Sequence, residues 1–149
     1  MTNRRAWSVM SLLAAAAVTV SCVQVTAAIS EQDLESWLAA YGAAWEAKDP
    51  AQVAALFTEN ALYQETPYAE PYRGRDGIAS YWASVTADQA DIEFRSEVIA
   101  IEGITGVAIW SANFRSIAGD VSVGLNGVFI LEFSDTSHVK LLREWWHAR

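Results

Sequence analysis

The chain has 149 residues, of which 52% are hydrophobic and 19% are charged, and its formal net charge is −8. This length accommodates one domain with a core of its own, and the composition excludes an intrinsically disordered chain. The acidic balance argues against nucleic acid and anionic membrane surfaces as binding partners.

The first 27 residues have the order of a secretory signal. Arg4 and Arg5 precede an apolar run over residues 9–20, and Val25-Thr26-Ala27 supplies a site for signal peptidase. The apolar run is too short to span a membrane comfortably. We therefore expect residues 1–27 to be removed when the protein is exported to the periplasm or the extracellular space.

The single cysteine, Cys22, leaves a second processing route open. Ser21-Cys22 resembles the end of a bacterial lipobox, although Thr19 stands where that pattern has an aliphatic residue. In this alternative Cys22 is lipidated and anchors the protein to a membrane. Ordinary cleavage instead leaves a domain over residues 28–149 without a thiol, which excludes a catalytic cysteine, a thiolate metal site and disulfides. Because two arginines and no acid are lost, its net charge becomes −10.

Two helices are predicted at the start of this domain. Ser30 is a helix N-cap followed by an acidic first turn. An apolar stripe at helical spacing follows it: Leu34, Trp37, Leu38, Tyr41 and Trp45. Lys48-Asp49-Pro50 ends this helix and begins a second one, in which Asp49 is the N-cap and Gln52 completes a capping box. The short second helix is expected to bury Val53, Leu56 and Phe57.

A short strand, a loop and a third helix come next. Residues 61–65 form the predicted strand, and two prolines within residues 66–71 exclude regular structure there. Asp76-Gly77 begins the third helix. Its inner face is expected to hold Ile78, Tyr81, Trp82 and Val85.

The rest of the chain has the pattern of β-strands. Four long strands are predicted, over residues 92–101, 106–116, 121–133 and 138–147. Helices followed by an antiparallel meander indicate an α+β fold. The last two strands are apolar on both faces, with Trp145 and Trp146 on opposite sides. We expect the helices to cover one face and a second copy of the chain, in a homodimer, to cover the other.

Carboxylates and aromatic side chains are the candidate functional groups. Glu65 closes the short strand, Glu144 shares one face of the last strand with Trp146, and Tyr41 lies on the buried stripe of the first helix. A carboxyl group in an apolar cavity can move protons, and a buried tyrosine hydroxyl can donate to an oxyanion. Structural roles stay open beside these: a core tyrosine, a loop cap at Glu65, and a pair between Glu144 and an arginine of the sheet.

Other chemistry has little support in the sequence. The two histidines, His138 and His147, lie near opposite ends of one strand, too far apart to share a metal ion, and we expect both to be solvated. Neither a Gly-x-Ser-x-Gly motif nor a glycine-rich phosphate loop occurs. We expect no metal and no cofactor.

The order of these motifs resembles the SnoaL-like branch of the nuclear transport factor 2-like superfamily, which includes ketosteroid isomerase-like domains. The similarity covers nearly the whole mature chain and rests on the Asp49-Pro50 break, residues 54–61, residues 73–78 and the closing run 142–147. It implies a cone-shaped fold, in which N-terminal helices pack on a curved, mostly antiparallel sheet around an apolar cavity.

The resemblance also implies roles for individual residues. Matched to the steroid isomerases, Tyr41 is similar to the oxyanion-hole tyrosine and Glu65 to the general base, whereas Phe129 replaces a protonated aspartic acid. The cavity is expected to be lined by Tyr41, Trp45, Trp82, Phe129 and Trp146. Two functions remain open, because this fold carries both. One is binding of a small, largely apolar molecule; the other is a cofactor-free isomerase, cyclase or hydratase using Glu65, with Glu144 as second choice.

Overall fold

The computed structural model describes residues 27–149. The expected cleavage signal and the lipidation alternative at Cys22 fall almost wholly on residues 1–26, which lie outside the described residues. Within residues 27–149, none of the helices has the length and apolar character needed to cross a membrane.

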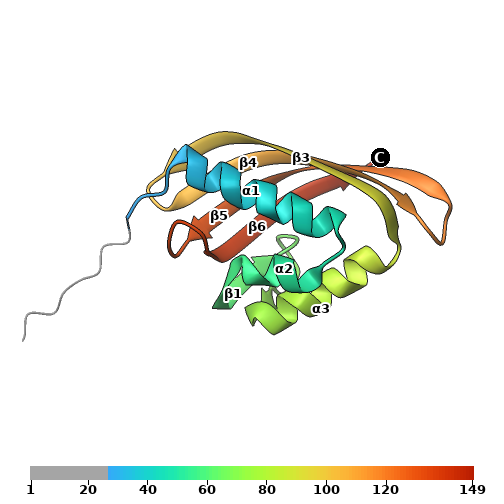
Figure 1. Ribbon diagram of the computed structural model, residues 1–149, viewed down its shortest axis with the longest axis horizontal. Coiled ribbons are helices and arrows are strands. Elements are labelled where there is room, and N and C mark those ends of the chain that lie inside the picture. The colour runs from blue at the N-terminus through green and yellow to red at the C-terminus, as the bar shows by residue number, and fades with distance from the viewer. Residues whose placement is uncertain (1–26) are drawn as a thin grey trace, which may run out of the picture.

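A six-stranded curved sheet with helices on one face makes up the described part of the chain (Figure 1). The helices are α1 (Glu31–Glu46), α2 (Pro50–Ala55) and α3 (Gly74–Ala87). The strands are β1 (Phe57–Gln64), β2 (Tyr72–Arg73), β3 (Gln89–Glu102), β4 (Thr105–Ser116), β5 (Val121–Phe133) and β6 (Val139–Ala148). They lie in the order β2-β1-β6-β5-β4-β3, and only β1 and β6 pair in parallel. This confirms the predicted α+β class with a mostly antiparallel sheet.

Helix α1 begins where its capping residue predicts. The Ser30 side chain accepts a hydrogen bond from the Asp33 backbone N–H, and the Asp33 carboxylate accepts one from the Ser30 N–H. Such a cap is typically worth about 1 kcal/mol. The helix packs closely on β3 at Gly42, where an added Cβ would lie 2.5 Å from Phe94. A glycine at this point therefore brings the apolar stripe of α1 against the sheet.

Helix α2 is two residues shorter than its sequence pattern suggests. We predicted that Phe57 lies on the buried face of this helix, but α2 ends at Ala55 and Phe57 is the first residue of β1. The reason lies at Leu56, whose carbonyl accepts hydrogen bonds from the Trp37 indole (3.0 Å) and the Val139 backbone N–H (3.0 Å). Long-range pairing with β6 thus ends the helix. The predicted cap at Asp49 is present, and its carboxylate also accepts a hydrogen bond from the Gln52 side chain.

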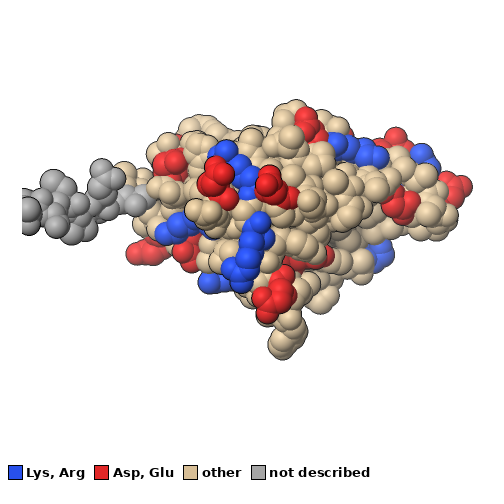
Figure 2. Space-filling model, turned by 90° about the horizontal axis from the view of Figure 1, so that it is seen from below, with Lys and Arg blue, Asp and Glu red and all other residues tan. Residues whose placement is uncertain are grey.

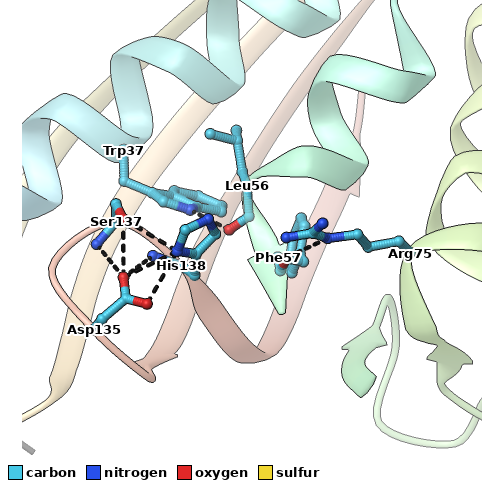
Figure 3. A network of polar contacts seen from close by, with 7 residues as sticks. All are labelled: Trp37, Leu56, Phe57, Arg75, Asp135, Ser137 and His138. Carbon is cyan, nitrogen blue, oxygen red and sulfur yellow. Dashed lines mark hydrogen bonds and ion pairs between the residues drawn. The ribbon is translucent and has the colours of Figure 1, made fainter. Parts of the chain in front are cut away.

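Further polar contacts hold the start of β1 and the turn before β6, as Figure 3 shows. The Arg75 guanidinium donates to the Phe57 carbonyl at 2.8 Å and so ties α3 to the start of β1. In the turn before β6, the Asp135 carboxylate accepts hydrogen bonds from the backbone N–H groups of Ser137 and His138, both at 2.8 Å. His138 therefore belongs to a turn, and His147, near the other end of β6, is exposed.

Helix α3 begins at Gly74, two residues before the predicted start. Gly74 has a φ of +67°, a left-handed conformation that glycine adopts at little cost. The inner face of the helix is as predicted, with Ile78 and Trp82 fully buried and Tyr81 and Val85 half-buried. This face closes the sheet from below and forms one wall of a cavity.

Charges of both signs are mixed over the surface. In the view of Figure 2, acidic and basic side chains alternate with uncharged ones. Several of them pair, for example Arg115 with Asp91 at 3.2 Å and with Asp120 at 3.5 Å. Exposed pairs of this kind contribute little stability. The absence of a nucleic-acid partner stays a prediction.

The face of the sheet that the helices leave uncovered carries apolar side chains. Ile109 of β4 is 42% exposed and Trp145 of β6 is 43% exposed. They border an open groove of about 620 Å³ that Val128 of β5 and Arg95 of β3 also line. Trp145 and Trp146 do point to opposite sides, since Trp146 lines a different cavity on the helix side.

We propose that this uncovered face is the contact surface of a homodimer, and we expect sedimentation equilibrium to give twice the monomer mass. Trp145→Asp should give the monomer mass at the same concentration, because it places a charge at the centre of an apolar contact. Ile117→Asp is the matched control, since Ile117 is 50% exposed but lies in the β4–β5 turn. A monomeric parent protein would rule the dimer out.

Candidate functional site

A cavity of about 290 Å³ lies between the helices α1 and α3 and the sheet, with lining residues from β1, β3, β4, β5 and β6. Eight of its lining residues are aromatic: Tyr41, Trp45, Tyr63, Tyr81, Trp82, Trp110, Phe114 and Trp146. The remaining ones are aliphatic except for Gln89 and two carboxylates. The site is therefore an aromatic chamber with acidic groups in its wall.

Six of the seven side chains singled out in the sequence line this one cavity: Tyr41, Trp45, Glu65, Trp82, Glu144 and Trp146. Tyr41 and Trp45 come from α1, Trp82 from α3, and Glu144 and Trp146 from one face of β6. Glu65 directly follows the last residue of β1. The structure thus brings both candidate carboxylates and the candidate tyrosine together, while their chemical roles stay predictions.

Phe129 is the exception, and its predicted place in the lining is wrong. It is fully buried and lies behind Trp110, whose ring stacks on it at a centroid distance of 5.2 Å. Trp110 can lie there because the facing residue on β5 is Gly127, where a Cβ would come within 2.6 Å of the indole. The glycine admits Trp110 as the cavity wall and leaves Phe129 in the layer behind it.

A chain of buried hydrogen bonds forms the polar side of the cavity. The Tyr63 hydroxyl donates to Glu144 Oε1 at 2.8 Å, and the hydroxyls of Tyr41 and Tyr63 are 2.9 Å apart. The three side chains come from β1, β6 and α1, and each is at most 4% exposed. Tyr63 was missed in the sequence, although strand alternation places it on the same face as Glu65, two residues later.

Glu144 is a carboxyl group without a counter-ion. Burial raises its pKa to about 8; the hydrogen bond from Tyr63 opposes this shift, and the nearby Glu65 adds to it. Neither carboxylate forms an ion pair with any described residue, so the arginine partner considered for Glu144 is absent from residues 27–149. Burial, and next the charge of Glu144, raises the pKa of the Tyr41 and Tyr63 hydroxyls well above the ordinary value. At neutral pH all three groups therefore keep their protons.

The proton on Glu144 sets the direction of the hydrogen-bond chain. When Glu144 is ionised, it accepts from Tyr63, which in turn accepts from Tyr41. When Glu144 is protonated, it can donate to Tyr63, which then donates to Tyr41 and leaves the Tyr41 O–H free for another acceptor. Tyr41 can thus donate into the cavity only while Glu144 is neutral.

Glu65 is half-buried, next to the stacked rings of Tyr72 and Tyr81, whose centroids are 4.1 Å apart. Burial, and then the carboxylates of the cavity, raises the pKa of Tyr81; burial and Glu65 raise that of Tyr72. Glu65 thus lies at the more exposed side of the site, and Glu144 at the sealed side.

The indole N–H groups of the lining are not available to a ligand. Trp45 donates to the Gln89 side chain at 2.8 Å. The nitrogens of Trp82 and Trp110 lack a partner among residues 27–149, but they have essentially no accessible surface. The polar groups of the lining that remain for a ligand are the hydroxyls, the carboxyl groups and the Gln89 amide. Within the same residues, no three His, Cys, Asp or Glu side chains lie close enough together to hold a metal ion.

A curved sheet closed on one face by helices, with an acid- and tyrosine-lined cavity between them, defines the ketosteroid isomerase-like cone of the nuclear transport factor 2-like fold. Residues 38–140 match the SnoaL-like domain, and the protein belongs to that family. A steroid Δ-isomerase from Nocardioides simplex is 24% identical over 97 residues, which cover 65% of this chain and 76% of that protein.

Solved structures share the same fold. The epoxide hydrolase/cyclase-like enzyme SalBIII, which has a role in pyran ring formation in the polyether salinomycin, superposes with a TM-score of 0.68 at 19% identity, over 79% of this chain and 93% of that one. A hypothetical protein from Catenulispora acidiphila in complex with trimethylamine has a TM-score of 0.66 at 13% identity, over 78% and 85%. At these identities the solved structures inform on the fold alone.

The stability of the parent protein should decrease as the pH rises, and replacing the buried acid Glu144 should abolish this decrease. The folded pKa of Glu144, about 8, is above the ordinary 4.5. Between these values the unfolded chain ionises while the folded protein does not, so the free energy of unfolding decreases with pH until the folded carboxyl also ionises. We expect Glu144→Gln to be free of this decrease, which amounts to a few kcal/mol at about 1.4 kcal/mol per pH unit.

Urea unfolding of both proteins from about pH 5 to pH 9 measures the difference. Glu59→Gln, at an exposed site on β1 outside both the cavity and the groove, is the matched control and should follow the parent. Parallel pH profiles for the parent and Glu144→Gln would show that Glu144 is not buried as an acid.

Proposed function

We propose that the protein binds a small, largely apolar organic molecule in this cavity. The aromatic lining supports this function, because ligand sites are mostly apolar with a few placed polar groups. At the packing density of a protein interior, about 290 Å³ holds a molecule of roughly a dozen non-hydrogen atoms. The ligand would enter past Glu65 and reach Tyr41 and Glu144 at the sealed side.

The observation that carries the proposal is the unpaired carboxyl group of Glu144. An acid buried without a counter-ion lowers stability, and an aliphatic residue would pack there without that cost. Groups that reduce stability in a cavity are characteristic of functional sites. The presence of Glu144 in the wall of this chamber is therefore better explained by a ligand than by the fold.

We also propose that this binding takes place outside the cytoplasm. The support is the order of arginines, apolar run and Val25-Thr26-Ala27 in the first 27 residues. Mass spectrometry of the exported protein should find an N-terminus after Ala27. A lipidated Cys22 would favour the anchored alternative, and an intact Met1 would contradict export.

Filling the cavity should abolish ligand binding. Leu125 lies on the cavity side of β5 and Val128 on the uncovered side of the same strand. In a thermal-shift screen of small apolar molecules, Leu125→Trp should lose the shifts that the parent shows, because the added ring occupies the chamber. Val128→Trp should keep them. Ligands that stabilise both variants equally would place the binding site elsewhere.

A second candidate function, acid–base catalysis, is favoured by the direction of the hydrogen-bond chain. With Glu144 protonated, Tyr41 can donate to a developing oxyanion. Glu144 would then supply the protonated acid that the steroid isomerases have at the position of Phe129. In a β,γ-unsaturated ketone, the Glu65 carboxylate would take a proton from the carbon between the carbonyl group and the double bond. The electron pair of the broken C–H bond delocalises over the carbonyl group and the double bond as a dienolate. Glu65 then returns the proton to the γ-carbon.

Conversion of cyclohex-3-enone into its conjugated isomer, followed by ultraviolet absorbance, tests this reaction. Glu65→Gln should lower the rate by about 10²–10⁴-fold, the usual contribution of a general base. The parent rate should fall above about pH 8, where Glu144 ionises and Tyr41 no longer donates to the oxyanion. Glu144→Gln should not show that fall, because an amide keeps its donor. A parent that converts no more than buffer would contradict the second candidate.

A further inference from the structure

We infer that the ligand is a small organic ammonium ion, either quaternary or a protonated tertiary amine, held between Glu65 and Glu144 and enclosed by aromatic rings. The inference rests on the proposed binding function and specifies the chemical class of the ligand. It depends on the charges in the cavity wall, on the arrangement of the rings and on the groups that the wall does not offer.

The charged groups of the cavity wall are all acidic. Glu65 and Glu144 line it, and none of the described lining residues is Lys, Arg or His. Two nearby arginines are engaged elsewhere: Arg75 donates to the Phe57 carbonyl, and Arg115 pairs with Asp91 and Asp120. The surface of Figure 2 mixes both signs, so the cavity differs from the surface in this respect. An anionic ligand would find no positive partner in this wall, whereas a cation would find two carboxyl groups to pair with.

The rings form adjoining walls. Trp82 meets Trp45 at 73° and Tyr41 at 88°, with centroids 5.0 and 5.3 Å apart, and it meets Tyr81 at 76° and 5.9 Å. All four residues line the cavity, so its wall is aromatic on several sides. The faces of aromatic rings are electron-rich, and several rings around one site bind the apolar surface of an alkylammonium ion by cation–π attraction.

The wall also has an acceptor that a cation could use. The indole N–H groups of Trp82 and Trp110 are sealed and that of Trp45 is bound to Gln89, so the donors of the wall are the tyrosine hydroxyls, the Gln89 amide and the protonated form of Glu144. Glu144 Oε1 accepts from Tyr63, while Oε2 has no hydrogen-bond partner among residues 27–149. A cation would pair with this carboxylate and offset the cost of burying it.

Binding of a cation should release a proton. The titratable groups that face Glu144 are Tyr41 of α1, Tyr63 of β1, Tyr81 of α3 and Glu65 after β1. The tyrosines hold their protons because burial raises the pKa of each. A neighbouring positive charge favours the ionised form of Glu144, so the proton leaves from this residue.

Choline and 3,3-dimethylbutan-1-ol are the test ligands. They have the same shape, but choline has a positively charged quaternary nitrogen where the alcohol has a neutral quaternary carbon. Calorimetric titration of the purified protein should show that choline binds at least about tenfold more tightly, as expected for a desolvated cation–π site. Choline should release a proton, seen as different heats in buffers of different ionisation enthalpy, and its affinity should increase towards pH 8. Glu65→Gln should weaken choline roughly tenfold and leave the alcohol unchanged.

Glu59→Gln is the control, because Glu59 is an exposed acid of β1 outside the lining. If the alcohol binds as tightly as choline, or more tightly, the inference is overturned while the proposed binding function stands. If choline does not bind at millimolar concentration, the inference is also overturned, and the comparison of Leu125→Trp with Val128→Trp decides the binding function separately. Choline binding that is equal in the parent and Glu65→Gln would also overturn it.

Discussion

The hydrogen bond between Tyr63 and Glu144 links three parts of the chain that are distant in sequence. It joins β1 to β6, and the hydroxyl of Tyr41 extends it to α1. The sheet makes this possible through its one parallel pair, in which Tyr63 lies opposite Leu142, two residues before Glu144. An antiparallel β1 would run the other way and carry Glu65 away from this part of β6. The parallel register is therefore what gathers both carboxylates at one cavity.

The same arrangement is costly for the fold. A carboxyl group at 4% exposure with one hydroxyl partner keeps its proton near neutral pH, because ionisation inside an aromatic core is unfavourable. Stability thus comes from the layer behind the cavity, where Phe129, Leu131 and Phe133 are fully buried between the sheet and α1. The molecule has an apolar core at the start of α1 and an aromatic chamber with acidic groups towards its end, and the chamber is where chemistry or binding is possible.

Local patterns were sufficient for most of the fold. Ser30 and the apolar stripe predicted α1, and the change from helical to alternating spacing predicted the α+β class. Alternation also placed Glu144 and Trp146 on one face of β6, and both line the cavity. These features depend on residues close in sequence, which is why a sequence can disclose them.

The errors concern contacts between distant segments. Phe57 continues a helical spacing, and only the bond from Val139 to Leu56 shows that it begins a strand. Phe129 has the size and alternation of a lining residue, but Gly127 lets Trp110 lie in front of it. Tyr63 could have been noted by its position two residues before Glu65. Its bond to Glu144, 81 residues away, could not be read from local spacing.

Binding of an ammonium ion and acid–base catalysis need opposite states of Glu144, and this makes them separable. Oxyanion stabilisation by Tyr41 needs the proton on Glu144, since only then does the hydroxyl chain end in a free donor. Pairing with an ammonium ion needs that proton removed, since a neutral acid neutralises no charge. The charge of the ligand thus determines the state of the acid. At a folded pKa of about 8, the neutral form prevails in the empty site, and a cation must displace the proton to bind. Cation binding would therefore strengthen as the pH rises, whereas catalysis through Tyr41 would weaken, so the sign of the pH dependence identifies which function the site performs.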